Sequence, residues 1–134
     1  MSSQSGETDL EILLESLEPE LHPAVHVFCT LERDEPIQDE VRPICQFQEA
    51  EGTTLIVEQS QAEAFQLDYT YPCRMITLTV HSSLEAVGLL ASVTQALAAK
   101  DISVNAISAY YHDHLFVECD RVADAMTCLQ RLKT

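Results

Sequence analysis

The feature that most constrains the fold is a regular change between strand and helix periodicity over residues 75–132. Alternating apolar and polar side chains predict strands, and apolar side chains at helical spacing predict helices. The order is strand, helix, strand, strand, helix. The expected elements are a strand over Met75–His81, a helix ending near Lys100, strands over Ser103–Tyr111 and His114–Cys119 around a turn at His112-Asp113, and a last helix capped by Asp120.

A crossover helix between paired strands predicts a right-handed unit whose helices cover one face of an antiparallel sheet. The pattern is a ferredoxin-like βαββαβ arrangement that lacks its last strand. An unpaired edge beside a buried core would be unfavourable, so the missing strand must come from the N-terminal half or from a partner subunit.

The first half of the chain is less regular. Its small polar start, residues 1–8, has too little apolar surface to offset the entropy of ordering, and we expect a disordered tail there. After it we expect a helix bearing Leu10, Leu13, Leu14 and Leu17, a strand over Ala24–Leu31, a hairpin of Arg42–Gln48 and Thr53–Glu58, a helix opened by a Ser60–Glu63 capping box, and a linker over Asp68–Pro72.

Together these elements predict an α+β protein made of two ferredoxin-like halves, with helices packed on antiparallel sheet faces. We place the N-terminal half at residues 9–73 and the C-terminal half at residues 74–134. With 134 residues the chain can bury one core, or two small halves that share one.

The charge of the chain excludes some partners. Lys and Arg number 7 against 22 Asp and Glu, a formal net charge of −15. Such a surface repels a phosphate backbone and anionic lipid, so we expect neither nucleic-acid nor membrane binding. No signal-peptide pattern precedes residue 9, and five widely spaced cysteines favour reduced thiols, with Cys29 and Cys119 as core residues. We therefore expect a cytoplasmic protein.

Enzymatic activity is not expected. Three glycines are too few for a phosphate-cradling loop, and no nucleophile lies beside a plausible base in a polar setting. A metal site built from His81, His112 and His114 is the alternative that we weigh and reject, because histidines that flank a tight turn are more often surface residues. We expect no metal and no cofactor.

The entry into the helix after Met75–His81 has the chemistry to hold an anion. Ser82 and Glu85 form a capping box, and a helix N-terminus offers backbone N–H groups and the positive end of the helix dipole to a carboxylate. Asp113 could accept hydrogen bonds from an ammonium or guanidinium group. The same residues also serve purely structural roles in many proteins, as a helix cap and a turn residue.

Three segments resemble the ACT family of regulatory domains: Glu85-Ala86-Val87-Gly88-Leu89-Leu90-Ala91, Leu97-Ala98-Ala99-Lys100-Asp101-Ile102 and Tyr110-Tyr111-His112-Asp113-His114-Leu115-Phe116-Val117. More narrowly, the chain is similar to aspartate-kinase-type ACT repeats, to animal cytosolic arginine sensors and to small bacterial proteins with two ACT-like halves. In the first half, Glu51-Gly52-Thr53-Thr54-Leu55-Ile56-Val57 carries the resemblance. One departure is Asp101, which stands where the family has glycine and can adopt the left-handed conformation at some cost.

The resemblance implies a non-catalytic sensor that binds an amino acid or similar effector between paired ACT halves or subunits, and it implies a homodimer. A structural or partner-binding oligomerisation module without a small ligand is the alternative. Carried over position by position, the family's ligand site falls on His81, Ser82, Ser83, Leu84, Glu85, Ala86, Val87, Gly88, Asn105, Tyr110 and Asp113.

Overall fold

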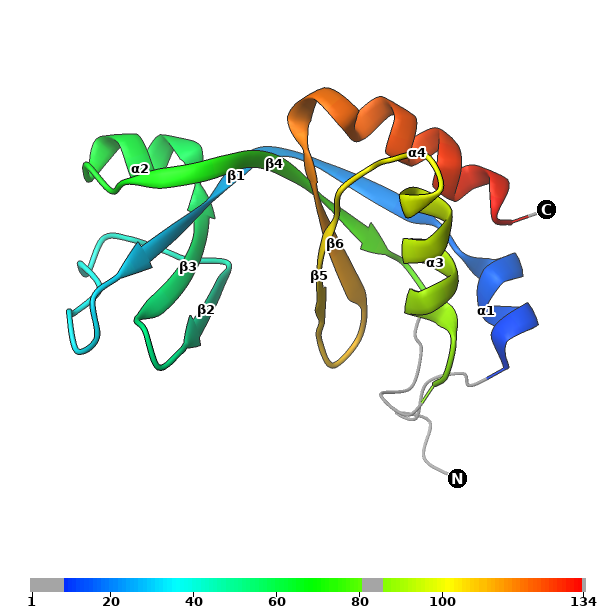
Figure 1. Cartoon of the computed structure of the whole chain (residues 1–134), viewed down its shortest axis with the longest axis horizontal. Helices are drawn as coiled ribbons and strands as arrows, with labels where there is room; N and C mark the ends of the chain where they lie inside the picture. The colour runs from blue at the N-terminus through cyan, green and yellow to red at the C-terminus, as the bar shows by residue number, and fades with distance from the viewer. Residues whose placement is uncertain (1–8, 81–85, 134) are drawn as a thin grey trace. The chain divides into compact units, whose positions relative to one another are not determined.

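The computed structural model describes residues 9–80 and 86–133. Figure 1 shows its elements in chain order. They are α1 (Leu10–Ser16), β1 (Pro19–Leu31), β2 (Cys45–Gln48), β3 (Thr53–Glu58), α2 (Gln59–Ala64), β4 (Tyr69–Leu78), α3 (Leu89–Ala98), β5 (Asn105–Ser108), β6 (Asp113–Glu118), the 3-10 helix η1 (Cys119–Arg121) and α4 (Val122–Arg131).

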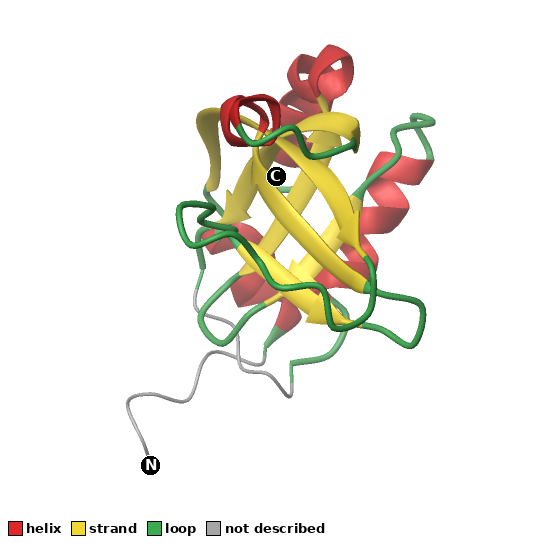
Figure 2. Ribbon diagram, turned by 90° about the vertical axis from the view of Figure 1, so that its left-hand side faces the viewer, coloured by secondary structure: helices red, strands yellow, loops and turns green. Residues whose placement is uncertain are grey.

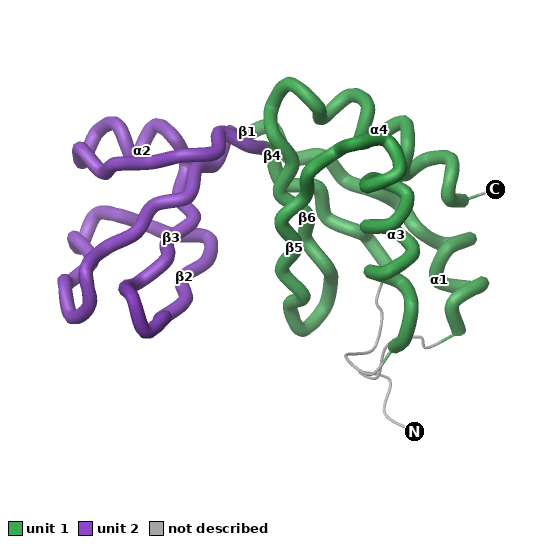
Figure 3. The backbone as a smooth tube through the Cα atoms, in the orientation of Figure 1, with its two compact units in different colours: residues 1–23, 74–134 green, residues 24–73 purple. Residues whose placement is uncertain are grey.

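The chain forms two compact units, one of residues 1–23 and 74–134 and the other of residues 24–73 (Figure 3). Both boundaries fall inside long strands, β1 and β4, so each of these strands contributes to both units. The strands follow the hydrogen-bonded order β2-β3-β1-β4-β6-β5. Each unit therefore has the four-strand order of a ferredoxin-like sheet, and the predicted fold class is confirmed.

In the unit of residues 1–23 and 74–134, β4, α3, β5, β6 and α4 follow the predicted order. The strand that the sequence left unassigned is the start of β1, which lies next to β4. β5 and β6 pair antiparallel in the register Asn105↔Phe116 to Ser108↔Asp113.

Helices α1, α3 and α4 pack over the core of this unit (Figure 1). Helix α1 begins at Asp9, whose carboxylate accepts hydrogen bonds from the amides of Glu11 and Ile12. Its Leu13 and Leu17 are fully buried, as are the members of the core contributed by the sheet and the other helices: Ile76, Leu78, Val93, Leu97, Leu115, Val117, Ala125 and Leu129.

In the unit of residues 24–73, β1 and β2 each pair antiparallel with β3. The connection from β1 to β2 contains turns but no helix (Figure 2), where a ferredoxin-like unit has its first helix. Part of that connection fills the helix's place: Val41 is buried, and Ile37 packs against the same core as Val27 and Leu55.

Several predicted boundaries in this unit are wrong. Residues 69–72 are not a linker but the start of β4, which continues in spite of Pro72 and of a positive φ of 63° at Tyr71. Those two residues look like a strand break in the sequence, because proline lacks an amide donor and a positive φ is unusual in a strand. Helix α2 begins after Glu58, so Ser60 is not its cap.

Two predictions near the start of the last helix of the other unit are also wrong. Asp120 lies in η1 and does not cap α4, which starts after Arg121 without a side-chain cap. Cys119 is exposed rather than buried, because it opens that short helix instead of ending a strand. By contrast, Cys29 is buried as predicted, and Asp101 has the expected left-handed conformation, with φ at 57°.

Candidate functional site

The predicted ligand loop is described only at its end. His81, Ser82, Ser83, Leu84 and Glu85 lie outside the described residues. Helix α3 starts at Leu89, so the expected capping box does not open it, and Ala86 and Val87 are not helical. The side chain of Val87 is 83% exposed.

Gly88 is the N-cap of α3 and has a φ of 101°, a conformation that residues with a side chain rarely adopt. This left-handed turn explains why the helix starts later than predicted. A Cβ atom at Gly88 would lie 3.2 Å from Cδ2 of Leu10, so the end of the ligand loop lies directly beside α1.

The turn between β5 and β6 carries two other predicted ligand residues. Tyr110 is exposed and packs edge-to-face on Tyr111, with 5.0 Å between ring centroids. Asp113 accepts a hydrogen bond of 2.5 Å from the hydroxyl of Ser108 on the opposite strand. Tyr110 therefore lies in the turn and Asp113 directly after it, as the first residue of β6, whereas the sequence predicted a turn at His112-Asp113.

A histidine joins this turn to the start of the ligand loop. Nδ1 of His112 lies 3.2 Å from the carbonyl oxygen of Val80. A carbonyl oxygen can only accept, so His112 carries a proton on Nδ1 and donates it. Val80 is the last described residue before the loop. The structure thus brings the hairpin turn beside Val80.

Asn105 lies elsewhere. It pairs with Phe116 at the opposite end of the hairpin from Ser108 and Asp113. These pairs are three residue steps apart along the strands, or roughly 10 Å at about 3.3 Å per residue. The structure does not group Asn105 with the turn and the loop.

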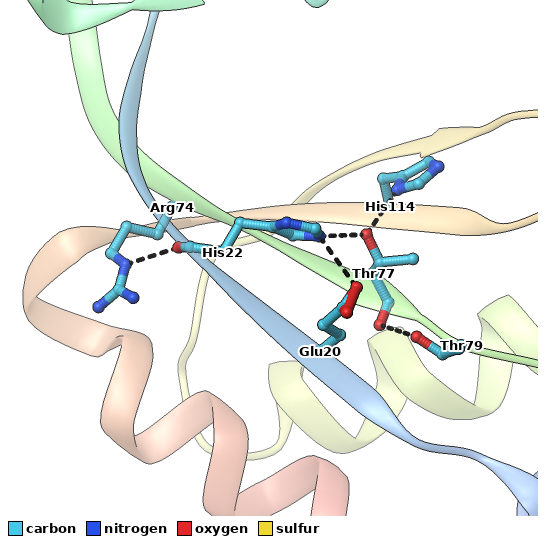
Figure 4. A network of polar contacts seen from close by, with 6 residues as sticks. All are labelled: Glu20, His22, Arg74, Thr77, Thr79 and His114. Carbon is cyan, nitrogen blue, oxygen red and sulfur yellow. Dashed lines mark hydrogen bonds and ion pairs between the residues drawn. The ribbon is translucent and has the colours of Figure 1, made fainter.

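A polar network on β1, β4 and β6 was not predicted (Figure 4). The hydroxyl of Thr77 lies 2.8 Å from Nε2 of His22 and 2.9 Å from Nδ1 of His114. Thr77 is only 5% exposed, so this hydroxyl depends on the two rings for its hydrogen bonds. Glu20 lies 3.6 Å from the same nitrogen of His22, and the side chain of Arg74 donates to the backbone carbonyl of His22.

Burial lowers the pKa of His114, and the neighbouring His112 and His22 lower it further, while Asp113 opposes the shift. His114 is therefore neutral near pH 7, with one ring nitrogen donating and the other accepting. The sequence signal for the network was weak. Thr77 stood at a polar position of one predicted strand and His114 at the start of another, but His22 fell between two prolines in a stretch without a strand pattern.

No group of three or more His, Cys, Asp and Glu side chains is arranged to hold a metal ion within the described residues. His81, the third histidine of the metal site that the sequence analysis rejects, lies outside them. Likewise, no helix in the part of the chain that the structure describes is long and apolar enough to cross a membrane.

Comparison with known proteins assigns the chain to a family. The sequence matches two ACT domain families, one over residues 5–74 and the other over residues 70–131. The chain belongs to the ACT domain family. It is a tandem ACT protein, and ACT domains are regulatory modules that bind small ligands.

Solved structures agree with this assignment. A Vibrio cholerae protein of unknown function, described as a possible transport protein, is 41% identical, with 93% of this chain and 96% of that chain covered and a TM-score of 0.84. An Agrobacterium tumefaciens protein is 12% identical, with coverages of 87% and 89% and a TM-score of 0.77. The regulatory subunit of aspartate kinase from Thermus flavus is 9% identical, with coverages of 88% and 97% and a TM-score of 0.60. The last two similarities concern the fold alone. No curated protein matches the sequence significantly.

Proposed function

We propose that this tandem ACT protein is a non-catalytic sensor that binds an amino acid, or a similar small effector, at the loop of residues 81–88 and the β5–β6 turn. The observation that carries the proposal is the hydrogen bond from His112 to Val80, because it holds the turn beside the start of the loop. Membership of a family of regulatory modules supports the same function.

The described part of this site has groups for both ends of a zwitterion. At the N-terminus of α3, the first backbone N–H groups have no partner within the helix and favour a carboxylate. The carboxylate of Asp113 accepts one hydrogen bond, from Ser108, and keeps further acceptor capacity for an ammonium group. Tyr110 is exposed beside it and can cover an apolar side chain.

We also propose that the protein acts in the cytoplasm as a homodimer, with domains at residues 9–73 and 74–134. In this proposal effector binding changes the surface offered to a regulated partner. Equilibrium sedimentation of the purified chain tests the dimer directly, and a monomer at all concentrations would contradict it.

A thermal-shift screen with each of the twenty amino acids tests the effector class. A ligand that binds only the folded state raises the melting temperature by mass action. We expect at least one amino acid to do so at millimolar concentration. A flat response to all twenty would contradict the proposal and favour an oligomerisation module without a ligand.

A further inference from the structure

Positive charge is scarce in this protein and unevenly placed. The chain has 7 Lys and Arg residues against 22 Asp and Glu. Three of those seven, Lys100, Arg121 and Arg131, line one surface hollow of about 300 Å³. The rest of its lining is Asp124, Thr127 and Cys128. A hollow with three cations and one carboxylate stands out on a surface that is otherwise strongly acidic.

The hollow follows from the packing of α4 beside the end of α3. The lining residues between positions 121 and 131 recur at intervals of three or four, which places them on one face of α4 and of the turn that leads into it. Lys100 follows the end of α3, and α3 and α4 are in contact. All of these residues belong to one compact unit, so the hollow does not depend on the other.

Arg121 is held in place by the backbone. Its terminal nitrogens donate to the carbonyl oxygens of Asp101 and Lys100, at 3.0 and 3.2 Å, just beyond the end of α3. Its Nε lies 3.5 Å from the carboxylate of Asp124. The acidic residue of the hollow is thus already paired, and Arg121 is positioned before any ligand arrives.

We propose that this hollow is an anion-binding site for a small phosphate-bearing metabolite. Guanidinium and ammonium groups are the side chains that bind phosphate in proteins, arginine through paired donors and lysine as a point charge. Lys100 and Arg131 are exposed, and both line the hollow. The hydroxyl of Thr127 donates to the carbonyl oxygen of Ala123 and therefore adds no donor.

The volume suits a small metabolite, since ligand pockets begin at about 300 Å³. The hollow is also separate from the proposed effector site. The effector loop leads into the N-terminus of α3, whereas Lys100 follows its C-terminus, and the ten residues of α3 span about 15 Å. The protein would then have one site at each end of this helix, and the two proposals can fail independently.

NMR titration with inorganic phosphate tests the site, with chloride at matched ionic strength as the reference. We expect saturable amide shifts at Lys100 and along residues 121–131. Lys100→Gln and Arg131→Gln should each weaken binding about tenfold, the loss expected for one charged hydrogen bond. Lys100→Arg and Arg131→Lys should retain binding, since they keep the charge.

Arg33→Gln is the matched control, because it removes one exposed positive charge from the other unit. It should leave phosphate binding unchanged. Absence of a saturable shift would overturn the proposal. So would equal weakening by Arg33→Gln, because phosphate would then respond only to net charge. Arg121 is left intact, since its loss would release the end of α3.

Discussion

Nδ1 of His112 lies 3.2 Å from the carbonyl oxygen of Val80, so the β5–β6 turn is held beside the segment that follows β4, where the proposed effector loop begins. Both residues are partly buried, which protects the hydrogen bond from competition by water. The contact fixes one wall of the proposed site relative to the other.

Removal of that contact should loosen the turn. We expect His112→Ala to lower the free energy of unfolding by about 1 kcal/mol, the usual net value of one hydrogen bond. His112→Gln keeps a side-chain donor and should recover part of the loss. Urea unfolding measures both variants, and equal stability of His112→Ala and the parent protein would show that the contact contributes nothing.

The hydroxyl of Thr77 should matter more, because two imidazole rings share it at a nearly buried position. Thr77→Val keeps the shape but leaves His22 and His114 without this partner, and we expect a loss of about 1–3 kcal/mol in urea unfolding. Thr79→Val is the matched control two residues away on an exposed position, where the hydroxyl makes only a 3.5 Å contact. Similar losses in both variants would argue against the network.

Stability should fall in acid because of His114. Its pKa is lowered in the folded state by burial and by His112 and His22, so the unfolded chain takes up the proton first as the pH falls. The stabilisation is complete above the unfolded value of about 6.5 and is lost below it. Urea unfolding between pH about 7.5 and about 5.5 should show this fall. His114→Asn should make it shallower, and an unchanged slope would contradict the assignment.

Helix α1 should be essential to the unit of residues 1–23 and 74–134. Leu13 is fully buried in its core, and we expect Leu13→Ala to cost about 2–5 kcal/mol, the usual range for a large apolar side chain. The neighbouring Ile12 is 46% exposed, and Ile12→Ala should cost much less. If thermal unfolding gave equal losses, α1 would not be packed as described.

Periodicity predicted the elements of this fold well where one face is buried and the other is polar. Ile76 and Leu78 on β4 and the apolar positions of α3 and α4 are in the core as expected. Periodicity failed to predict the strands that continue through prolines. Pro19 and Pro23 hid the first part of β1, and Pro72 hid the start of β4, so the sharing of these two strands between the units was not predictable from local patterns.

The candidate site was predictable only in part. The hairpin that carries Tyr110 and Asp113 follows from the strand pattern, although its turn lies between Ser108 and Asp113 and not at the predicted His112-Asp113. The start of α3 could not be predicted in the same way, because a Ser-x-x-Glu capping box is a stronger local signal than one glycine. In the structure, the left-handed conformation of Gly88 sets the start of the helix. His22 joined the network through the pairing of distant strands, which no local pattern records.

The central claim is that an amino acid binds at the loop and turn of the C-terminal ACT domain. Calorimetric titration of the amino acid that most raises the melting temperature, into the parent protein and into Asp113→Ala, tests it most directly. We expect Asp113→Ala to weaken binding about tenfold, because an ammonium group loses its charged partner. Asp120→Ala, which removes an exposed carboxylate from η1, should bind as the parent does. Equal affinity in the parent and Asp113→Ala would contradict the account.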